Sequence, residues 1–370
     1  MLNPDTDFLR PVQLLMGLPF DAVSLDEAVQ RVEAAARERR GCFLSTPNLN
    51  WLVACQTDPA FRNSVLKSDL SLADGMPIIW LARLLGLPVT QRVSGSDVFQ
   101  ALRACAVSVY FFGGPPGFAG RACEKLNAAG APMTCRGHHS PGFGSIEDMS
   151  GAEVLDDINA SAADFVVVAL GARKGQAWIE HNLDRLAPPL VSHLGAVVNF
   201  VAGSVARAPA LVARLGLEWV WRIKEEPALW RRYFMDGLGF LGYLARHGLA
   251  ARGLSRDAAR RADPASGRVR VVADAQRCQI ALAGDWTRAN ITRLGSALAQ
   301  HCQQPRDLNL DLSGLGRADG AFLGLLAVLR GHQLKHGRVL EIQPPRGAAR
   351  DLFRHFAADY LLDSLAGSGA

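Results

Sequence analysis

The 370-residue sequence lacks the features that direct a protein into or across a membrane. It contains no run of about 18 or more consecutive apolar residues, and its most apolar stretch, residues 165–171, is only as long as a strand. The N-terminus carries Asp5 and Asp7 before a short apolar stretch, so it lacks the basic start and long apolar core of a secretory signal. We therefore expect a cytoplasmic protein whose contact with a membrane is peripheral.

The sequence also lacks any pairing pattern among its cysteines. Seven are scattered along the chain, an odd number with no CxxC pair and no metal-ligand spacing. We expect reduced thiols, as in cytoplasmic proteins. His138 and His139 lie in a predicted loop without further ligands, so we expect no metal site.

The composition is that of a folded protein with more than one hydrophobic core. Hydrophobic residues make up 49% of the chain and charged residues 20%, which excludes a disordered class. The length predicts two domains.

Residues 11–194 alternate short β-rich runs with helical patterns, which predicts a mostly parallel α/β sheet. Ser24 with Glu27 predicts a helix start, as does Asp58 before Pro59, and Gly86 suits a helix end. In open parallel sheets, ligands bind beyond the carboxyl ends of the strands, so the residues that follow each strand are candidates. The predicted strands are residues 42–45, 70–73, 107–112, 165–170 and 190–193.

Polar side chains follow the first two predicted strands. Thr46 and Asn48 come after residues 42–45, and Asp74 comes after the next strand. Taken alone, these side chains are most simply helix caps. If both strand ends face one crevice, Asp74 lies beside Thr46 and Asn48 and becomes a workable general base for an acceptor hydroxyl.

Two further turns offer groups for an anionic ligand. Arg92 and Asp97 flank a glycine turn, where Arg92 can either bind a phosphate or pair with Asp97. Gly113 and Gly114 precede a predicted helix and would let backbone amides approach a diphosphate. These glycines form neither a GxGxxG nor a Walker loop and fit many α/β turns.

After Arg207 the pattern changes to helices rich in Trp and Arg. Residues 204–263 contain eleven Arg or Lys and six Asp or Glu, so the positive charge is concentrated there. The mixture of charges and aromatics fits a solvated basic face over a helical core, or a surface at a membrane interface.

The rest of the chain forms a second unit. Residues 248–266 show no clear apolar periodicity, which predicts a linker. A second α/β pattern, at residues 267–370, predicts strands near 269–272, 279–283, 308–312 and 339–342, with helices near 291–301, 322–335 and 348–356.

In combination and order, the motifs of residues 10–246 resemble the WecG/TagA/CpsF family of glycosyltransferases. We expect a Rossmann-like, mostly parallel sheet with a helical C-terminal appendage at about 207–247, so that the transferase domain covers residues 1–247. The motifs that carry the resemblance are TPN at 46–48, ADG at 73–75, RVSGSD at 92–97, FFGG at 111–114, SPGFG at 140–144, GARKGQ at 171–176, NFVAGSVARAP at 199–209, LGLEWVWR at 215–222 and EEPALWRRY at 225–233.

The resemblance implies an inverting, metal-independent transfer of a sugar from a UDP-sugar, often of the N-acetylmannosamine type. The implied acceptor is linked to undecaprenyl diphosphate at the cytoplasmic face of the inner membrane, in cell-envelope or exopolysaccharide biosynthesis. By the same resemblance Asp74 is the base, Thr46 and Asn48 place the donor or acceptor, and Arg92 lies near the nucleotide sugar. We expect no cofactor and no nucleic-acid partner.

The family's appendage contributes arginines that close over the active site and approach the acceptor's diphosphate. Arg222 and Arg232 match that appendage best, and Arg207 and Arg231 are additional candidates. A solvated basic face is the competing explanation.

The chain departs from the family pattern in two places. Arg173 stands where the family usually has Pro, and Gly175 stands where it usually has Gln, so the adjacent Gln176 becomes the candidate substrate-binding residue. Asn199 replaces a usual Asp. Neither change touches Asp74.

Residues 267–366 resemble a STAS domain. The pattern that carries this resemblance is the strand at 308–312, the turn at 313–320 and the apolar helix that follows. In regulatory members a phosphorylatable serine follows the aspartate at the helix start, and here that position is Gly320. We expect a constitutive docking role, with a partner protein, a nucleotide or the transferase domain as its target.

Two functions of different class remain. The first is an active glycosyltransferase, and the second is a non-catalytic scaffold that binds nucleotide or lipid and recruits partners through the STAS-like domain. A nicotinamide dehydrogenase is disfavoured because the spacing of Gly113 and Gly114 is wrong.

Overall fold

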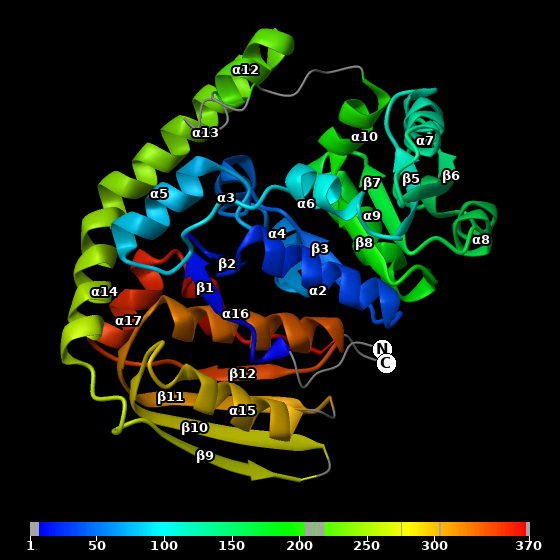
Figure 1. Ribbon diagram of the computed structural model, residues 1–370. Helices are drawn as coiled ribbons and strands as arrows, with labels where there is room; N and C mark the ends of the chain where they lie inside the picture. The colour runs from blue at the N-terminus through cyan, green and yellow to red at the C-terminus, as the bar shows by residue number, and fades with distance from the viewer. Residues whose placement is uncertain are drawn as a thin grey trace.

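The computed structural model describes residues 7–203, 209, 212, 218–274, 276–302 and 305–367. Figure 1 shows an α/β domain with a parallel sheet, a long helical segment along one side, and a smaller α/β domain packed beneath the first. This architecture confirms the predicted fold class.

The larger domain is built on a six-stranded parallel sheet in the order β4-β3-β8-β7-β5-β6. The chain steps outward from β3 to β4 and then adds the remaining strands on the other side of β3, which opens a crevice at the carboxyl ends of β3 and β8. The five predicted strands are confirmed to within two residues. The strands are β3 (Cys42–Ser45), β4 (Leu70–Ser71), β5 (Ser108–Gly113), β6 (Thr134–His139), β7 (Phe165–Ala169) and β8 (Leu190–His193).

Helices pack on both faces of this sheet. Neighbouring residues such as Phe111 and Phe112 enter different cores, as the alternation of side chains along a strand requires. The helices are α2 (Leu25–Arg37), α3 (Leu49–Ala54), α4 (Pro59–Leu66), α5 (Met76–Leu85), α6 (Gly95–Leu102), α7 (Phe118–Ala128), α8 (Ala152–Ala160), α9 (Ala172–Asn182) and α10 (Gly195–Ala202), with short 3₁₀ turns η1 (Asp148–Ser150) and η2 (Leu183–Arg185).

The predicted helix boundaries are confirmed at three points. Ser24 and Glu27 form a complete capping box at the start of α2. The Asp58 carboxylate accepts a hydrogen bond of 3.0 Å from the Phe61 amide at the start of α4. Gly86 ends α5 in the left-handed conformation, with φ of 73°.

The prediction of a loop at His138 and His139 is wrong. Both residues belong to β6, the edge strand that pairs with β5. This strand is polar and largely exposed, so its sequence lacks the apolar alternation that identifies a strand. The hairpin of β1 (Val12–Leu15) and β2 (Leu18–Asp21) is a further addition to the predicted elements.

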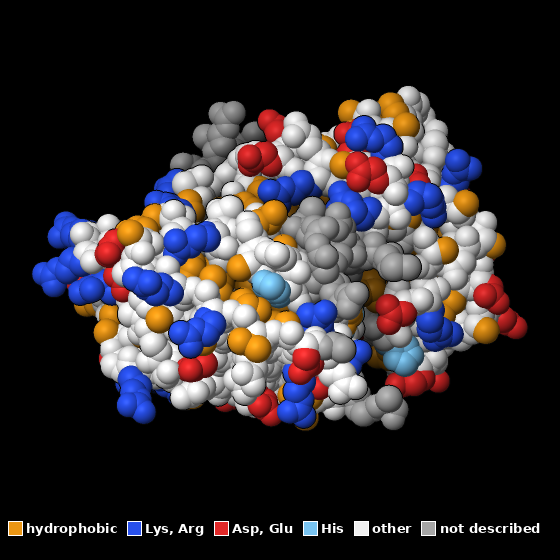
Figure 2. All heavy atoms as spheres, turned by 90° about the horizontal axis from the view of Figure 1, so that it is seen from below, with side chains coloured by type: hydrophobic (Ala, Val, Ile, Leu, Met, Phe, Trp, Pro, Cys, Tyr) orange, Lys and Arg blue, Asp and Glu red, His pale blue; other side chains and the backbone are white. Residues whose placement is uncertain are grey.

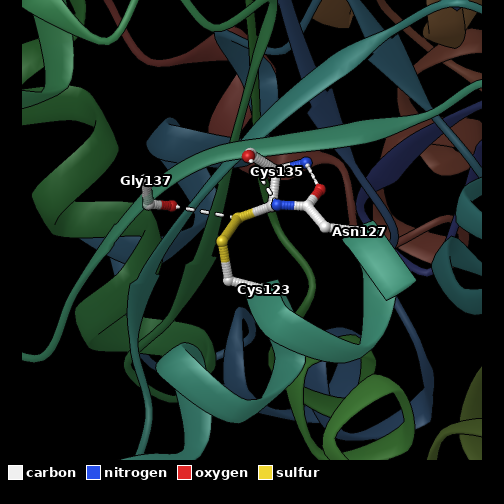
Figure 3. The surroundings of a disulfide bond; sticks show 4 residues. All are labelled: Cys123, Asn127, Cys135 and Gly137. Carbon is white, nitrogen blue, oxygen red and sulfur yellow. Dashed lines mark hydrogen bonds between the residues drawn. A yellow bond between two sulfur atoms is a disulfide. The ribbon is translucent and has the colours of Figure 1, made fainter. Parts of the chain in front are cut away.

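The prediction that all seven cysteines are reduced is also wrong. Cys123 of α7 is bonded to Cys135 of β6, and their Cα atoms are 5.2 Å apart (Figure 3). The Asn127 side chain exchanges two hydrogen bonds with the backbone of Cys135, which fixes this end of the strand against the helix. The pairing depends on the packing of α7 on β6, which no cysteine spacing reveals.

The predicted linker is largely helical. The appendage comprises α12 (Glu218–Glu225), the 3₁₀ turn η3 (Pro227–Leu229) and α13 (Trp230–Tyr243), and it continues through one π-helical turn, η4 (Leu244–Gly248), into α14 (Leu249–Arg261). The buried face of α14 consists of Ala251, Ser255 and Ala258. These residues have helical spacing but are small, so the sequence shows no apolar stripe there.

The smaller domain confirms the remaining predicted elements. Its sheet has the order β12-β11-β10-β9, in which β9 and β10 pair antiparallel and the other two pairs of strands are parallel. The elements are β9 (Arg268–Ala273), β10 (Arg277–Trp286), α15 (Ile291–Cys302), β11 (Asp307–Ala318), α16 (Gly320–Lys335), β12 (Leu340–Gln343), α17 (Ala348–His355) and the 3₁₀ turn η5 (Asp359–Leu362).

Helix α16 is buried between the two domains. Every residue from Gly320 to Gln333 is buried, and the helix contacts β1, β2 and α4 of the larger domain as well as its own sheet. A Cβ atom on Gly324 would lie 2.6 Å from the Val12 carbonyl oxygen, and one on Gly331 would lie 2.0 Å from the Leu66 carbonyl oxygen. The two backbones approach this closely because glycine occupies both positions.

Buried charges join the same two domains. Lys335 at the end of α16 forms an ion pair with Asp69 and lies 3.6 Å from Asp7. Arg10 pairs with the buried Asp21 at 2.6 Å within the larger domain. Because a buried charge that loses its partner is strongly destabilising, the contacts of Lys335 fix the position of α16 on the larger domain.

Candidate active site

A cavity of about 1390 Å³ lies at the carboxyl ends of the central strands. Its walls come from the strand ends, from α5, and from the appendage helices α12 and α13. The structure brings seven of the nine predicted site residues into its lining, namely Thr46, Asn48, Asp74, Arg92, Gly114, Arg222 and Arg232. Gly113 and Gln176 are not among the lining residues.

Asp74 lies just beyond β4 and does not cap the next helix. Gly75 occupies the cap position of α5, and no side chain caps this helix. Burial raises the pKa of the Asp74 carboxyl to about 7, and the negative charges of Glu218 and Asp97 act in the same direction. Arg92 and Arg222 oppose the increase. A carboxyl group with a pKa near neutrality is suited to accept a proton at physiological pH.

Arg92 connects the sheet domain to the appendage. Its guanidinium donates to Asp97 at 2.7 Å and to Glu218 of α12 at 2.9 Å. The predicted pairing with Asp97 is therefore present, and the role of Arg92 in phosphate binding stays a prediction.

Thr46 and Asn48 combine a structural contact with access to the cavity. The Asn48 side chain caps α3 by accepting a hydrogen bond of 3.3 Å from the Trp51 amide. Thr46 packs against Gly95. A Cβ atom built on Gly95 would lie 3.2 Å from the hydroxyl oxygen of Thr46. Both side chains line the cavity.

The Gly113–Gly114 turn differs from the prediction. The Gly114 amide donates to the Ala169 carbonyl oxygen at 2.8 Å, so it is already used within the fold. A Cβ atom on Gly113 would lie 2.7 Å from the same oxygen, and φ at Gly113 is 101°. These glycines therefore allow the ends of β5 and β7 to approach closely, and the Gly114 amide is not directed at a ligand.

Gln176 also differs from the prediction. Its side chain is completely buried, and its amide nitrogen donates to the Ser45 hydroxyl at 2.8 Å. Helix α9 turns this residue toward the sheet, behind the cavity wall. In the sequence, Gln176 is the candidate substrate-binding residue because Gly175 stands where the family usually has Gln. In the structure Gln176 is not among the residues that line the cavity.

The appendage supplies two of the predicted arginines. The Arg222 guanidinium lies 5.5 Å from the Phe200 ring, and the Arg232 guanidinium lies 5.1 Å from the Tyr233 ring. Asn50 donates to Asp236 of α13 at 3.1 Å and holds the appendage against α3. Arg231 is exposed outside the lining, and Arg207 lies outside the described residues.

The sequence prediction missed His193, the last residue of β8. This residue lines the cavity, and its ring centroid is 6.1 Å from that of Trp51. His193 is the last residue of the predicted strand at 190–193, and its place at the carboxyl end of a parallel strand could have identified it as a site residue. In the described part of the chain, no three His, Cys, Asp or Glu side chains are grouped as a metal site.

Comparison with known proteins decides the family. The model of the glycosyl transferase WecG/TagA/CpsF family matches residues 12–253, and a STAS domain model (Mlab, STAS domain) matches residues 269–363. The chain belongs to the WecG/TagA/CpsF family of glycosyltransferases. It carries a STAS domain behind the transferase domain, as the second match shows.

Three relatives of this chain carry the name N-acetylglucosaminyldiphosphoundecaprenol N-acetyl-beta-D-mannosaminyltransferase. The protein from Bacillus spizizenii is 30% identical over 200 residues, which is 53% of this chain and 76% of the relative. The protein from Bacillus subtilis is 28% identical over 226 residues, which is 60% of this chain and 86% of the relative. A Staphylococcus aureus protein is 22% identical over 213 residues, which is 56% and 82% respectively.

None of the transferase's described helices combines the length and the hydropathy that a membrane span requires.

If Asp74 is the base, the rate of the transferase depends on pH near neutrality. Only the ionised carboxylate accepts a proton, so with a pKa of about 7 we expect kcat/KM to fall about tenfold per pH unit well below that pKa and to level off above it. The measurement is a pH profile of acceptor-dependent UDP release. The same inflection in Asp74→Asn would assign the titration to another group.

Proposed function

We propose that this protein is an inverting glycosyltransferase that moves a sugar from a UDP-sugar, of the N-acetylmannosamine type or related, to an undecaprenyl-diphosphate-linked acceptor. The reaction belongs to cell-envelope or exopolysaccharide biosynthesis. The observation that carries the proposal is Asp74, a carboxyl group with a raised pKa in a large cavity that three arginines line. The names of the relatives support the lipid-linked acceptor.

The chemistry follows from these groups. Asp74 takes the proton of the acceptor hydroxyl as its oxygen attacks the anomeric carbon of the donor. The bond from that carbon to the diphosphate breaks on the opposite face, and UDP leaves with the bonding electrons. Arg92, Arg222 and Arg232 supply positive charge for the diphosphates of donor and acceptor.

The test is UDP release from a panel of UDP-sugars, with and without a short-chain polyprenyl-diphosphate-linked N-acetylglucosamine. Acceptor-dependent release with one donor supports the proposal and names that donor. Binding of nucleotide or lipid without release from any donor supports the scaffold instead.

An apolar surface on the appendage supports contact with the cytoplasmic face of the inner membrane. Trp230, Phe234, Leu238 and Leu241 follow one another at helical spacing along α13 and are 55%, 58%, 48% and 60% exposed. Leu241 also lines the cavity, as do Trp80 and Phe240. We call these side chains the apolar wall, and in this proposal the lipid of the acceptor lies along it between the bilayer and Asp74.

We expect Phe234→Glu with Leu241→Glu to abolish most of the binding to vesicles of phosphatidylglycerol and phosphatidylethanolamine, because two charges replace the apolar contact. Cosedimentation with the vesicles measures the bound fraction of the protein. The matched control is Val272→Glu on β9, which is equally exposed at 62% but lies in the smaller domain. Equal loss in the control, or none in the double variant, contradicts membrane contact through α13.

For the STAS domain we infer that its constitutive target is the transferase domain itself. The burial of α16, including Gly320 at its start, supports this. A separate protein partner would have to use the opposite face of the domain. Figure 2 views the molecule from the side of β9 and β10 and shows Lys and Arg side chains spread over this face with Asp and Glu among them.

A further inference from the structure

His193 lines the cavity but has no part in the reaction steps described above. Its Nε2 atom is buried and has no hydrogen-bond partner among the described residues. A buried polar atom without a partner destabilises the free protein, and in a cavity wall a bound ligand can provide that partner.

The imidazole occupies space that a side chain at position 175 would fill. A Cβ atom on Gly175 would lie 2.3 Å from Cδ2 of His193 and 2.9 Å from its Cγ. No side chain at 175 can coexist with the ring in this position. Gly175 is one of the positions at which the sequence departs from the pattern of the family that it resembles, and the position of the His193 ring requires this glycine.

Gly195 lies on the other side of the ring. A Cβ atom built on Gly195 would lie 3.2 Å from Nε2 and 3.4 Å from Cε1 of His193, and apart from residues 194–196 and the nearby backbone of α10 no other described atom lies within 4 Å of it. Gly195 also lines the cavity. A ligand atom beside Gly195 is therefore within hydrogen-bonding distance of Nε2.

The chemistry of the ring selects a neutral polar partner. Burial lowers the pKa of His193 to about 4, so the imidazole is uncharged at neutral pH. A neutral ring donates or accepts one hydrogen bond at Nε2, which suits a hydroxyl or acetamido group better than a diphosphate.

The position in the sheet indicates which part of the substrate is near. Strand β8 lies between β3, which leads to Thr46, and β7, which is followed by Gly171. His193 is thus at the centre of the crevice, whereas the apolar wall of α5 and α13 is at the appendage side. The donor sugar must lie in this centre if the acceptor enters along the apolar wall.

We propose that His193 is a specificity-determining residue that hydrogen-bonds through Nε2 to a hydroxyl or acetamido group of the donor hexose. The proposal rests on the proposed glycosyl transfer.

The first experiment measures kcat and KM of the full-length protein for UDP-N-acetylmannosamine, UDP-N-acetylglucosamine, UDP-glucose and UDP-galactose. We expect His193→Ala to raise the KM of the preferred donor about tenfold, the effect of one neutral hydrogen bond, and to reduce the discrimination among donors. The KM of the acceptor stays unchanged, and His193→Gln recovers part of the preference. Unchanged donor KM and preference, or an effect confined to the acceptor, overturns the proposal.

The second experiment tests whether a side chain at position 175 and the His193 ring compete for the same space. Gly175→Gln alone is expected to lower the Tm and weaken donor binding, because the new side chain collides with the ring. Adding His193→Gly is expected to restore the Tm, so the two changes are not additive. Additive losses contradict the shared space.

Failure of the proposed function is distinguishable from failure of this inference. If the unmodified protein releases UDP from no donor, the proposed transfer fails. Calorimetric titration with the same four UDP-sugars then compares the unmodified protein with His193→Ala. Equal affinities for all four overturn the role of His193, and a selective loss supports it.

Discussion

Asp74→Asn is expected to reduce acceptor-dependent UDP release by about 10²–10⁴-fold, the usual contribution of a positioned general base. The amide has nearly the shape of the carboxylate but cannot accept the proton of the acceptor hydroxyl. Donor KM is expected to change little, because the arginines that line the cavity remain. The measurement is steady-state UDP release at about pH 8, above the pKa of about 7.

The same substitution is expected to stabilise the fold at that pH. The pKa of Asp74 is raised in the folded state, so the folded protein favours the protonated carboxyl. The stability that this provides is fully present below the unfolded-state value of 3.8 and is lost as the pH rises through about 7. The neutral amide avoids that loss, so Asp74→Asn should raise the Tm at about pH 8 and have less effect at about pH 5.

These two readouts separate catalysis from folding. Loss of turnover together with a raised Tm is the expected result. Near-normal turnover in Asp74→Asn would exclude Asp74 as the base. Loss of turnover with a lowered Tm would attribute the loss to damage of the fold.

Truncation after Ala262 is expected to unfold the transferase domain or render it insoluble. The truncation removes α16, and with it the cover that this helix gives to β1, β2 and α4 in the shared core. Exposing one buried apolar side chain costs about 1.5–3 kcal/mol, so exposing a few of them approaches the whole stability of a domain, about 5–15 kcal/mol. It also leaves Asp69 without Lys335.

Circular dichroism and thermal unfolding of the truncated chain provide the measurement. Retention of a cooperative transition near that of the full-length protein would show that the STAS domain is dispensable for the fold. In that case its place beside the transferase would need another explanation.

A point substitution tests the same contact without removing the domain. Gly331→Ala is expected to destabilise the protein, because its Cβ would lie 2.0 Å from the Leu66 carbonyl oxygen. The control is Gly253→Ala in α14, where nothing lies within 4 Å and alanine favours the helix. We expect Tm shifts of opposite sign. Equal shifts would contradict the close contact of α16 with α4.

The sequence alone was sufficient for the features that depend on local patterns. Capping residues and alternation predicted the strands of the main sheet and the elements of the STAS domain, because both act within a few residues. The position of Asp74 after its strand made it a candidate for the crevice, since parallel strands end at one edge, but it left a helix cap as the simpler interpretation. The ordered motifs were sufficient to predict the family, which the comparison confirms.

Tertiary structure decided what each side chain meets. Gln176 is turned toward Ser45 by the register of α9 on the sheet, and the Gly114 amide is taken by Ala169 of the neighbouring strand. The buried face of α14 consists of small residues, so its burial depends on the packing of this helix on its neighbours and not on an apolar stripe in the sequence.

Contacts between distant residues decided the remaining features. Cys123 meets Cys135 because α7 packs on β6, and α16 is buried because β1, β2 and α4 cover it. His193 fits because Gly175, 18 positions earlier in the sequence, leaves the space for its ring. Local sequence determines the backbone elements and where they end, whereas these pairings depend on how the elements pack in three dimensions.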